Sequence, residues 1–157
     1  MAALPKIKAK SRSAALTALL NQSLASAIDL KLQAKQAHWN VKGENFIALH
    51  ELFDKASAEI DEYADMLAER TVQLGGIAQG TLQAVGKSSG LSPYPANIQD
   101  SQQHIKALGG GIGALAESLR QAIDTADAEG DAVTADLFTE ITRGLDKLRW
   151  FVESHRQ

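Results

Sequence analysis

Residues 38–54 read HWNVKGENFIALHELFD, and they join two long helical patterns through a short polar turn at residues 40–43. On each side of the turn, apolar residues recur at the spacing of three and four positions that an amphipathic helix requires. The stretch also holds two of the chain's four histidines, His38 and His50, and Asp54 follows His50 by about one helical turn. It therefore predicts a helical hairpin, and it raises the question of whether these three side chains form half of a metal site.

Working outward from this hairpin, the pattern predicts an all-α four-helix bundle with a long crossover between the second and third helices. The crossover contains Gly and Pro and has room for one short helix near residues 81–87. In the third helix, GGGIG at 109–113 leaves two alternatives open: a break, or close helix packing, since each interior Gly costs about 1 kcal/mol relative to Ala. The four helices are expected at about residues 13–39, 45–74, 97–128 and 131–154.

The composition is that of one globular domain. The chain has 157 residues, of which 45% are hydrophobic and 22% charged, and its net charge is −3. It contains no cysteine, which excludes disulfides, thiolate metal sites and a cysteine nucleophile. No run approaches the roughly 20 apolar residues of a membrane span. A cytoplasmic protein fits this composition, and we expect association with the nucleoid if the protein binds DNA.

The first twelve residues differ from the rest of the chain in charge, because their basic residues all precede the first acidic residue, Asp29. We expect residues 1–12 to form a flexible basic tail, followed by the bundle over residues 13–157. The basic start followed by AALTALL has the outline of a signal peptide. Cleavage after residues 25–27 would however cut the first helix in half. The candidates for DNA contact in the tail are Lys6, Lys8, Lys10 and Arg12.

The helix over residues 45–74 carries two separate faces when its side chains are placed at about 100° per residue. One face is apolar and includes Leu49, Phe53, Ile60 and Leu67. A solvated polar face is one interpretation of the other, but Lys and Arg, which usually mix with carboxylates on such a face, are absent from it. A metal-binding face is the alternative. Its histidine and carboxylates are His50, Asp54, Asp61, Asp65 and Glu69.

Two i,i+4 pairs on this face, His50/Asp54 and Asp65/Glu69, can each grip one cation. Their midpoints lie fifteen residues apart, roughly 22 Å along the helix, so they cannot share an ion within one chain. An antiparallel second copy would bring them together across a two-fold axis. His38 would stand at a similar height across the hairpin.

This arrangement predicts a site made of His38, His50 and Asp54 from one chain with Asp65 and Glu69 from another. Ser57 and Ala58 would lie beside the two-fold axis and allow close approach. Imidazoles with several carboxylates suit Fe(II), Mn(II) or Zn(II), and carboxylates suit Fe(III) after oxidation.

KQAHWNVKGENFIALHELFD and YADMLAERTVQLGG resemble the two-part signature of the Dps family, the ferritin-like mini-cage proteins of starved bacterial cells. TADLFTEITRGLDKLRWFVES is similar to the last helix of that family. The resemblance implies a shell of twelve subunits with ferroxidase centres at two-fold interfaces. It also implies oxidation of Fe(II) by hydrogen peroxide or O₂, storage of a ferric mineral and protection of DNA from oxidative damage. The ligand positions that it implies are His38, His50, Asp54, Asp65 and Glu69.

Several other residues have two interpretations. Trp39 is either a packing aromatic at the dimer seam or an electron donor beside the site, and Asp61 is either a surface carboxylate or a proton shuttle. In the family, acidic pore residues lie near the start of the last helix, where Asp131 and Asp136 stand here. The local EGDAV is however not a close match, and Asp131 is equally placed to cap the last helix. We expect His104 and His155 to lie on the surface.

Two other metal-dependent functions fit the sequence less well. HELFD at 50–54 resembles a zincin helix, but Asp stands where the second His belongs. A di-iron site inside the bundle would need Glu three residues before His. The four histidines instead follow Lys35, Ile47, Ser101 and Val152 at that spacing. A nonspecific DNA-compacting protein and a helical assembly without chemistry stay open.

Overall fold

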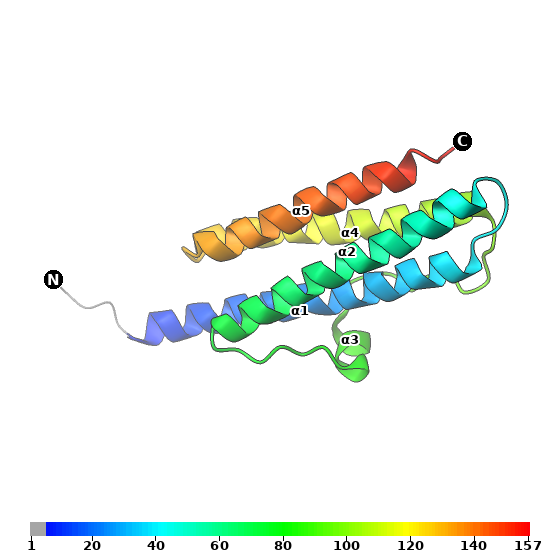
Figure 1. Cartoon of the computed structure of the whole chain (residues 1–157). Helices are drawn as coiled ribbons and strands as arrows, with labels where there is room; N and C mark the ends of the chain where they lie inside the picture. Colours follow the sequence, from blue (N-terminus) through cyan, green and yellow to red (C-terminus); the bar gives the residue numbers. More distant parts are fainter. Residues whose placement is uncertain (1–5) are drawn as a thin grey trace.

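A computed structural model describes the backbone of residues 6–157 and the side chains of residues 14–157. It confirms the all-α four-helix bundle and the short helix in the crossover (Figure 1). Within the described range, the only β pairing is one isolated bridge between Lys42 and Asp100. The helices are α1 (Lys6–Asn40), α2 (Phe46–Gln73), α3 (Leu82–Ser88), α4 (Ser101–Ala128) and α5 (Ala132–Glu153).

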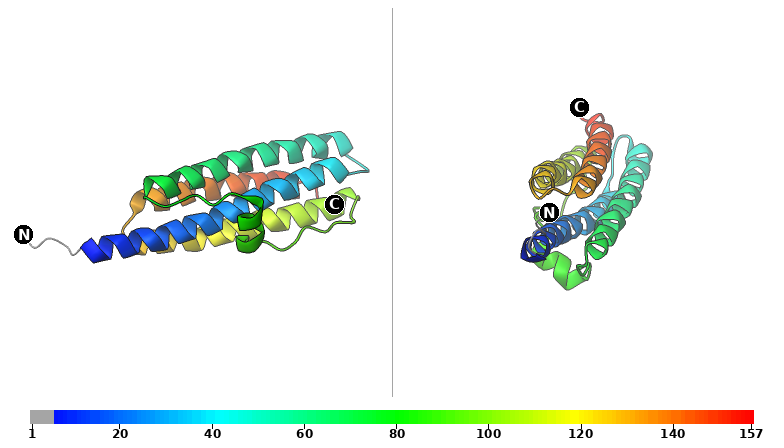
Figure 2. Two further views of the ribbon diagram at one scale, coloured as in Figure 1. Left: turned by 90° about the horizontal axis from the view of Figure 1, so that it is seen from below. Right: turned by 90° about the vertical axis from the view of Figure 1, so that its left-hand side faces the viewer.

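The bundle consists of two helical hairpins. Seen end-on, α1 lies beside α2 and α4 beside α5, while α3 lies outside the bundle against α1 (Figure 2). The apolar face predicted for α2 is buried in the core between these pairs, as expected for an amphipathic helix. Its residues Leu49, Phe53, Ile60 and Leu67 are all at most 1% exposed.

The turn between α1 and α2 is shaped by two residues with positive φ, Gly43 at +104° and Asn45 at +59°. Glycine and asparagine are the residues that adopt this conformation most easily. The turn is held against the end of the crossover, because the Lys42 N–H donates to the Gln99 carbonyl at 2.8 Å. This contact fixes the end of α1 on which His38 lies.

Helix α4 runs without interruption through GGGIG, so the break considered from the sequence does not occur. Close packing explains three of these glycines. A Cβ at Gly109 would lie 3.2 Å from Glu153, one at Gly111 would lie 3.0 Å from Leu30, and one at Gly113 would lie 2.8 Å from Arg149.

Two predicted helix starts need correction. Helix α1 begins at Lys6 rather than near residue 13, and no Gly or Pro interrupts residues 6–40. Helix α4 begins at Ser101 rather than near residue 97, because the Asp100 carboxylate caps it by accepting from the N–H groups of Gln102 and Gln103.

The predicted basic tail, residues 1–12, is described only in part, and its residues 6–12 have the helical backbone of α1. Residues 1–5 are not described, and the side chains of Lys6, Lys8, Lys10 and Arg12 are not described either. The tail and its contact with DNA therefore stay predictions. Among residues 6–157, no helix is both long and apolar enough to cross a membrane.

Candidate metal centre

The two histidines of the opening stretch face each other across the α1–α2 hairpin. His38 Nδ1 lies 2.7 Å from the His50 carbonyl oxygen, and His50 Nδ1 lies 2.8 Å from the His38 carbonyl oxygen. Their rings stack with centroids 3.8 Å apart, and both residues are half-buried. The hairpin thus locks the two imidazoles against each other by a reciprocal pair of hydrogen bonds.

The end of α1 explains one of these bonds. In a continued helix the Lys42 N–H would donate to the His38 carbonyl, but it donates to Gln99 instead. The His50 ring satisfies the carbonyl that is left. The local break in the helix therefore creates the acceptor that orients His50.

These hydrogen bonds decide which ring nitrogen is available. A carbonyl oxygen can only accept, so Nδ1 of both rings must carry a proton and donate. In the neutral imidazole, Nε2 is then left with its lone pair, and it has no hydrogen-bond partner among residues 14–157 in either ring. Metal-binding histidines are typically oriented by a bond of this kind from the second ring nitrogen to a carbonyl. The chemistry of His38 and His50 thus fits a divalent metal ion.

Asp54 lies next to the histidines but is held by a cation. Lys35 Nζ of α1 makes a short ion pair with Asp54 Oδ1, and the Asp54 side chain is 51% exposed. The hydrogen bond from Lys35 lowers the pKa of Asp54, and the charges of Lys35, His38 and His50 act in the same direction against partial desolvation. A metal ion binding to Asp54 must therefore compete with the Lys35 ammonium group.

Asp61 is held in the same way, because Lys31 Nζ lies 2.7 Å from Asp61 Oδ1. Neither lysine was predicted as a partner of these carboxylates, because both lie on α1 and not on the helix that carries the acidic face. A signal was present: Lys31, Lys35 and His38 follow one another at i, i+4 and i+7, which places them on one face of α1. The acidic face of α2 is thus partly neutralised by α1.

Asp65 and Glu69 differ from Asp54 in having no such partner. Both residues are exposed, and among residues 14–157 neither forms a hydrogen bond or ion pair. The same part of the chain contains no group of three His, Cys, Asp or Glu side chains that could hold a metal ion. Within one chain, the five predicted ligands therefore remain divided into two separate groups.

Two residues near the predicted site are Trp39, whose role stays open, and Ser57, whose predicted position beside the two-fold axis needs correction. Trp39 is 67% exposed beside His38, so its ring is free to pack against another surface. Ser57 is buried, and its hydroxyl donates to the Lys31 carbonyl at 3.2 Å. It packs α2 on α1 within the chain and is not free to lie at a two-fold axis, whereas Ala58 is exposed.

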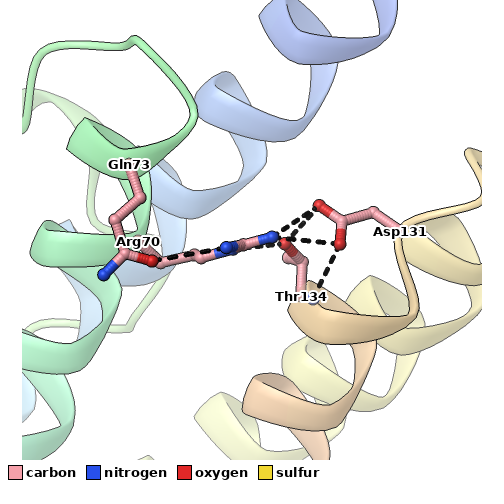
Figure 3. Close-up of polar contacts among 4 residues, drawn as sticks. All are labelled: Arg70, Gln73, Asp131 and Thr134. Carbon is pink, nitrogen blue, oxygen red and sulfur yellow. Dashed lines mark hydrogen bonds and ion pairs between the residues drawn. The ribbon is translucent and has the colours of Figure 1, made fainter.

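Asp131 caps α5, which was one of its two expected roles. Its carboxylate accepts from the Thr134 N–H at 3.0 Å and from the Thr134 hydroxyl at 2.6 Å, and Arg70 Nη2 of α2 lies 3.1 Å from both oxygens (Figure 3). Burial alone would raise the pKa of Asp131, but the bonds from Thr134 and the charge of Arg70 outweigh it and lower the pKa.

Asp136 is exposed and lines a hollow of about 240 Å³ together with Glu69 and Glu140.

The surface location expected for His104 is wrong, because this residue is 1% exposed. Its Nδ1 lies 2.7 Å from the Tyr94 hydroxyl, which joins α4 to the crossover. Burial disfavours the imidazolium and lowers the pKa of His104. The spacing of His104 from Ile105, Leu108 and Ile112, all buried, would have predicted this position.

Comparisons with known proteins agree with this architecture. The ferritin-like domain profile matches residues 17–157. A DNA protection during starvation protein of Agrobacterium fabrum is 51% identical over 139 residues, which are 88% of this chain and 86% of the relative. The chain belongs to the Dps family.

Solved Dps structures support this assignment at the level of the fold. Dps from Microbacterium arborescens in the high iron form has a TM-score of 0.85 and 38% identity, and the match covers 92% of this chain and 93% of the other. The tetragonal form of Mycobacterium smegmatis Dps has a TM-score of 0.89 and 32% identity, covering 99% and 94%. The bundle described here is thus the Dps fold over nearly its whole length.

Proposed function

We propose that this Dps-family protein oxidises Fe(II) with hydrogen peroxide or O₂ at sites shared between two subunits and stores the ferric product. In this proposal Fe(II) is the substrate, and Zn(II) or Mn(II) can occupy the same ligands. The observation that carries the proposal is the pair of fixed imidazoles, His38 and His50, each of which has a free Nε2 beside Asp54. A two-fold partner would add Asp65 and Glu69, which have no use within the described chain.

Each group in the proposed site has a separate role. His38 and His50 bind Fe(II) through Nε2, while the hairpin carbonyls hold their rings in place. Asp54, Asp65 and Glu69 supply oxygen ligands that also suit Fe(III), which favours oxidation over release. Lys35 would release Asp54 when the metal ion binds, so that the ion replaces the ammonium group as the positive charge beside this carboxylate. Consuming Fe(II) and peroxide together would protect DNA from hydroxyl radicals.

The assembly that the proposal requires is a two-fold dimer, and by resemblance to the family a cytoplasmic dodecamer built from six such dimers. In this dimer, the exposed ring of Trp39 would pack at the seam beside His38. Asp61, paired with Lys31, would be a surface carboxylate outside the ligand set. Asp131 and Asp136 stay predictions as pore residues, and for Asp131 the pairing with Arg70 reduces the charge available to an ion.

A subunit-mixing experiment tests whether the site is shared. One variant, His38→Ala with His50→Ala, removes the imidazole half. A second, Asp65→Asn with Glu69→Gln, removes the carboxylate half. The two are co-expressed with different affinity tags, and assemblies that carry both tags are purified. Oxidation of Fe(II) is then followed by ultraviolet absorbance with peroxide or with O₂.

In a mixed dimer, both mutated halves meet at one interface site and both intact halves meet at the other. Each variant alone should be nearly inactive, and random mixing should restore about a quarter of the wild-type rate, because a two-fold dimer has two equivalent sites. A mixed assembly that stays as inactive as its components would refute the shared site. Full activity of either variant alone would refute the ligand assignment itself.

Nonspecific DNA binding is the second candidate function, and the charge of the N-terminal segment favours it. Several copies of Lys6, Lys8, Lys10 and Arg12 on one shell could add their weak contacts with phosphates. A gel shift at increasing salt, with and without residues 1–12, tests this. Retardation that disappears on truncation supports the tail, and retardation that persists assigns DNA binding to another surface.

A further inference from the structure

A pocket of about 600 Å³ lies between the end of the crossover and one face of α4. Crossover residues 91–95 form one wall, α4 forms the opposite wall, and Gln33 of α1 also lines the pocket. This volume falls in the range of about 300–1,000 Å³ that is typical of small-molecule sites. The pocket shares no residue with the predicted iron site, so its use is a separate question.

Gly110 lies in the α4 wall and has no packing role among the residues that the structure describes. A Cβ at Gly109, Gly111 or Gly113 would crowd a neighbouring side chain, whereas a Cβ at Gly110 would meet nothing within 4 Å. A glycine inside a helix costs about 1 kcal/mol relative to Ala. The open space over Gly110 allows another molecule to approach the helix backbone closely.

Gln33 presents an unused acceptor to this space. The residue is 6% exposed, and its Nε2 donates to Asp29 Oδ1 and to the Ser92 carbonyl, both at 3.1 Å. These bonds fix the amide, and Oε1 then faces Gly111, where it lies 3.3 Å from the position of a Cβ. Among residues 14–157, no donor reaches Oε1. A hydrogen-bond acceptor that the fold leaves open on the wall of a pocket can accept from a donor group on a ligand.

Of the described side chains that line the pocket, Lys106 is the only charged one. Its side chain is exposed, and it makes no ion pair with any of residues 14–157. Lys106 precedes Gly111 by five residues, which is about 7.5 Å along the helix axis. The pocket therefore offers a cation and a hydrogen-bond acceptor separated by a mainly apolar surface that includes Pro93, Tyr94 and Ala107.

We propose that this pocket binds a small amphipathic anion: a flat apolar body with one carboxylate group and a hydroxyl group at the opposite end. The carboxylate would pair with Lys106, and the hydroxyl would donate to Gln33 Oε1. The apolar body would lie over Gly110 against the prolines and Tyr94 of the crossover. The proposal is independent of the iron chemistry.

Three probes separate these contributions in calorimetric titrations of the assembled, metal-free protein. The first, 6-hydroxy-2-naphthoate, carries both polar groups, 2-naphthoate lacks the hydroxyl, and 2-naphthol lacks the carboxylate. We expect saturable binding of the first probe with one site per chain. Losing the hydroxyl should weaken binding about two- to tenfold, and losing the carboxylate should weaken it about two- to fivefold.

Two variants with matched controls locate the site. Gly110→Leu should weaken all three probes at least about tenfold, because its side chain occupies the space of the ligand. Ser118→Leu, which adds the same side chain to an exposed position of α4 outside the pocket, should not. Lys106→Gln should weaken both carboxylates about two- to fivefold and leave 2-naphthol unchanged. Lys87→Gln on α3 is its control.

Three results would overturn the proposal. The first is the absence of saturable binding by the wild type. The second is unchanged binding by Gly110→Leu, with circular dichroism confirming that the variant is folded. The third is a loss of 2-naphthol binding in Lys106→Gln as large as that of the carboxylates. Because Lys106 is on the surface, its variant tests the proposal even if Gly110→Leu fails to fold.

Discussion

The two ends of the acidic face of α2 differ in what the rest of the chain gives them. At one end, His50 and Asp54 face α1, which provides His38 as a stacking partner and Lys35 as a counter-ion. At the other end, Asp65 and Glu69 are exposed and have no partner among residues 14–157. The hairpin therefore holds the side chains of the first half-site in place, whereas the carboxylates of the second half-site make no contact that stabilises the described chain.

This difference predicts that residues at the two ends of the acidic face contribute unequally to stability, although both ends are needed for activity. A side chain that is bonded within the chain contributes to folding as well as to chemistry, and a side chain without a partner contributes to chemistry alone. The proposed shared site needs both halves for activity. Variants that lack one half of the site at a time test this separation.

Removing either half-site should lower the rate of Fe(II) oxidation at least roughly 100-fold, since changes even around metal ligands commonly cost 10- to 100-fold. The variants of the two half-sites should differ in their free energy of unfolding. Asp65→Asn with Glu69→Gln should change the free energy of unfolding by less than about 0.5 kcal/mol. His38→Ala should lower it by about 1 kcal/mol, because a hydrogen bond and a ring contact are lost.

Stopped-flow absorbance and denaturant unfolding of the same preparations check this pair of effects. Glu62→Gln, an exposed carboxylate on α2 outside the ligand set, is the matched control and should retain the wild-type rate. Equal losses of stability in both half-site variants would contradict the asymmetry.

Asp131, unlike Asp65 and Glu69, is a carboxylate that is already bonded within the chain. Asp131→Ala should lower the free energy of unfolding by about 2 kcal/mol, since it removes the cap of α5 and leaves Arg70 unpaired. Asp131→Asn should cost about half as much, because an amide still caps the helix.

The effect of Asp131 should also depend on pH. Its pKa in the folded protein lies below the ordinary value of 3.8, so folding is favoured by the ionised carboxylate above that value. The difference in unfolding free energy between wild type and Asp131→Asn should therefore shrink as the pH falls below about 4. Urea unfolding at pH 3 and at pH 7 measures this, and a difference that grows in acid would contradict it.

Replacing Lys35 should have the smallest effect of these changes, and it should strengthen metal binding where the others cause a loss. Lys35→Met removes the cation that competes for Asp54, so Zn(II), used as a redox-inert probe, should bind about two- to fivefold more tightly. Lys31→Met removes the equivalent cation from Asp61, which is outside the ligand set, and should leave Zn(II) affinity unchanged. Calorimetric titration distinguishes the two variants. Weaker binding by Lys35→Met would mean that the lysine holds Asp54 in its productive position.

Much of the candidate site could be read from residue spacing. Helical periodicity placed His50 and Asp54 on one face of α2 and separated them from the core residues, which are buried as expected. The same spacing showed that Asp65 and Glu69 lie too far along the helix to join them. These conclusions need only the rise and the turn of an α-helix, so the sequence was sufficient.

Contacts between helices could not be read in this way. Spacing along one helix does not show that Lys35 of α1 holds Asp54, that Ser57 packs against α1, or that the Tyr94 hydroxyl contacts His104 Nδ1. Each of these depends on the rotation and height of two elements relative to each other. Periodicity within one element leaves both quantities undetermined.

The sequence by itself determined the number of helices, the face of α2 that carries the ligands and the resemblance to the Dps family. Only the tertiary structure decided that α4 continues through GGGIG, because neighbouring side chains fill the space over three of its glycines. It also decided which nitrogen of His38 and of His50 is free. The reason is physical: the tautomer is fixed by a carbonyl on the facing helix, and that carbonyl comes into reach only when the hairpin closes.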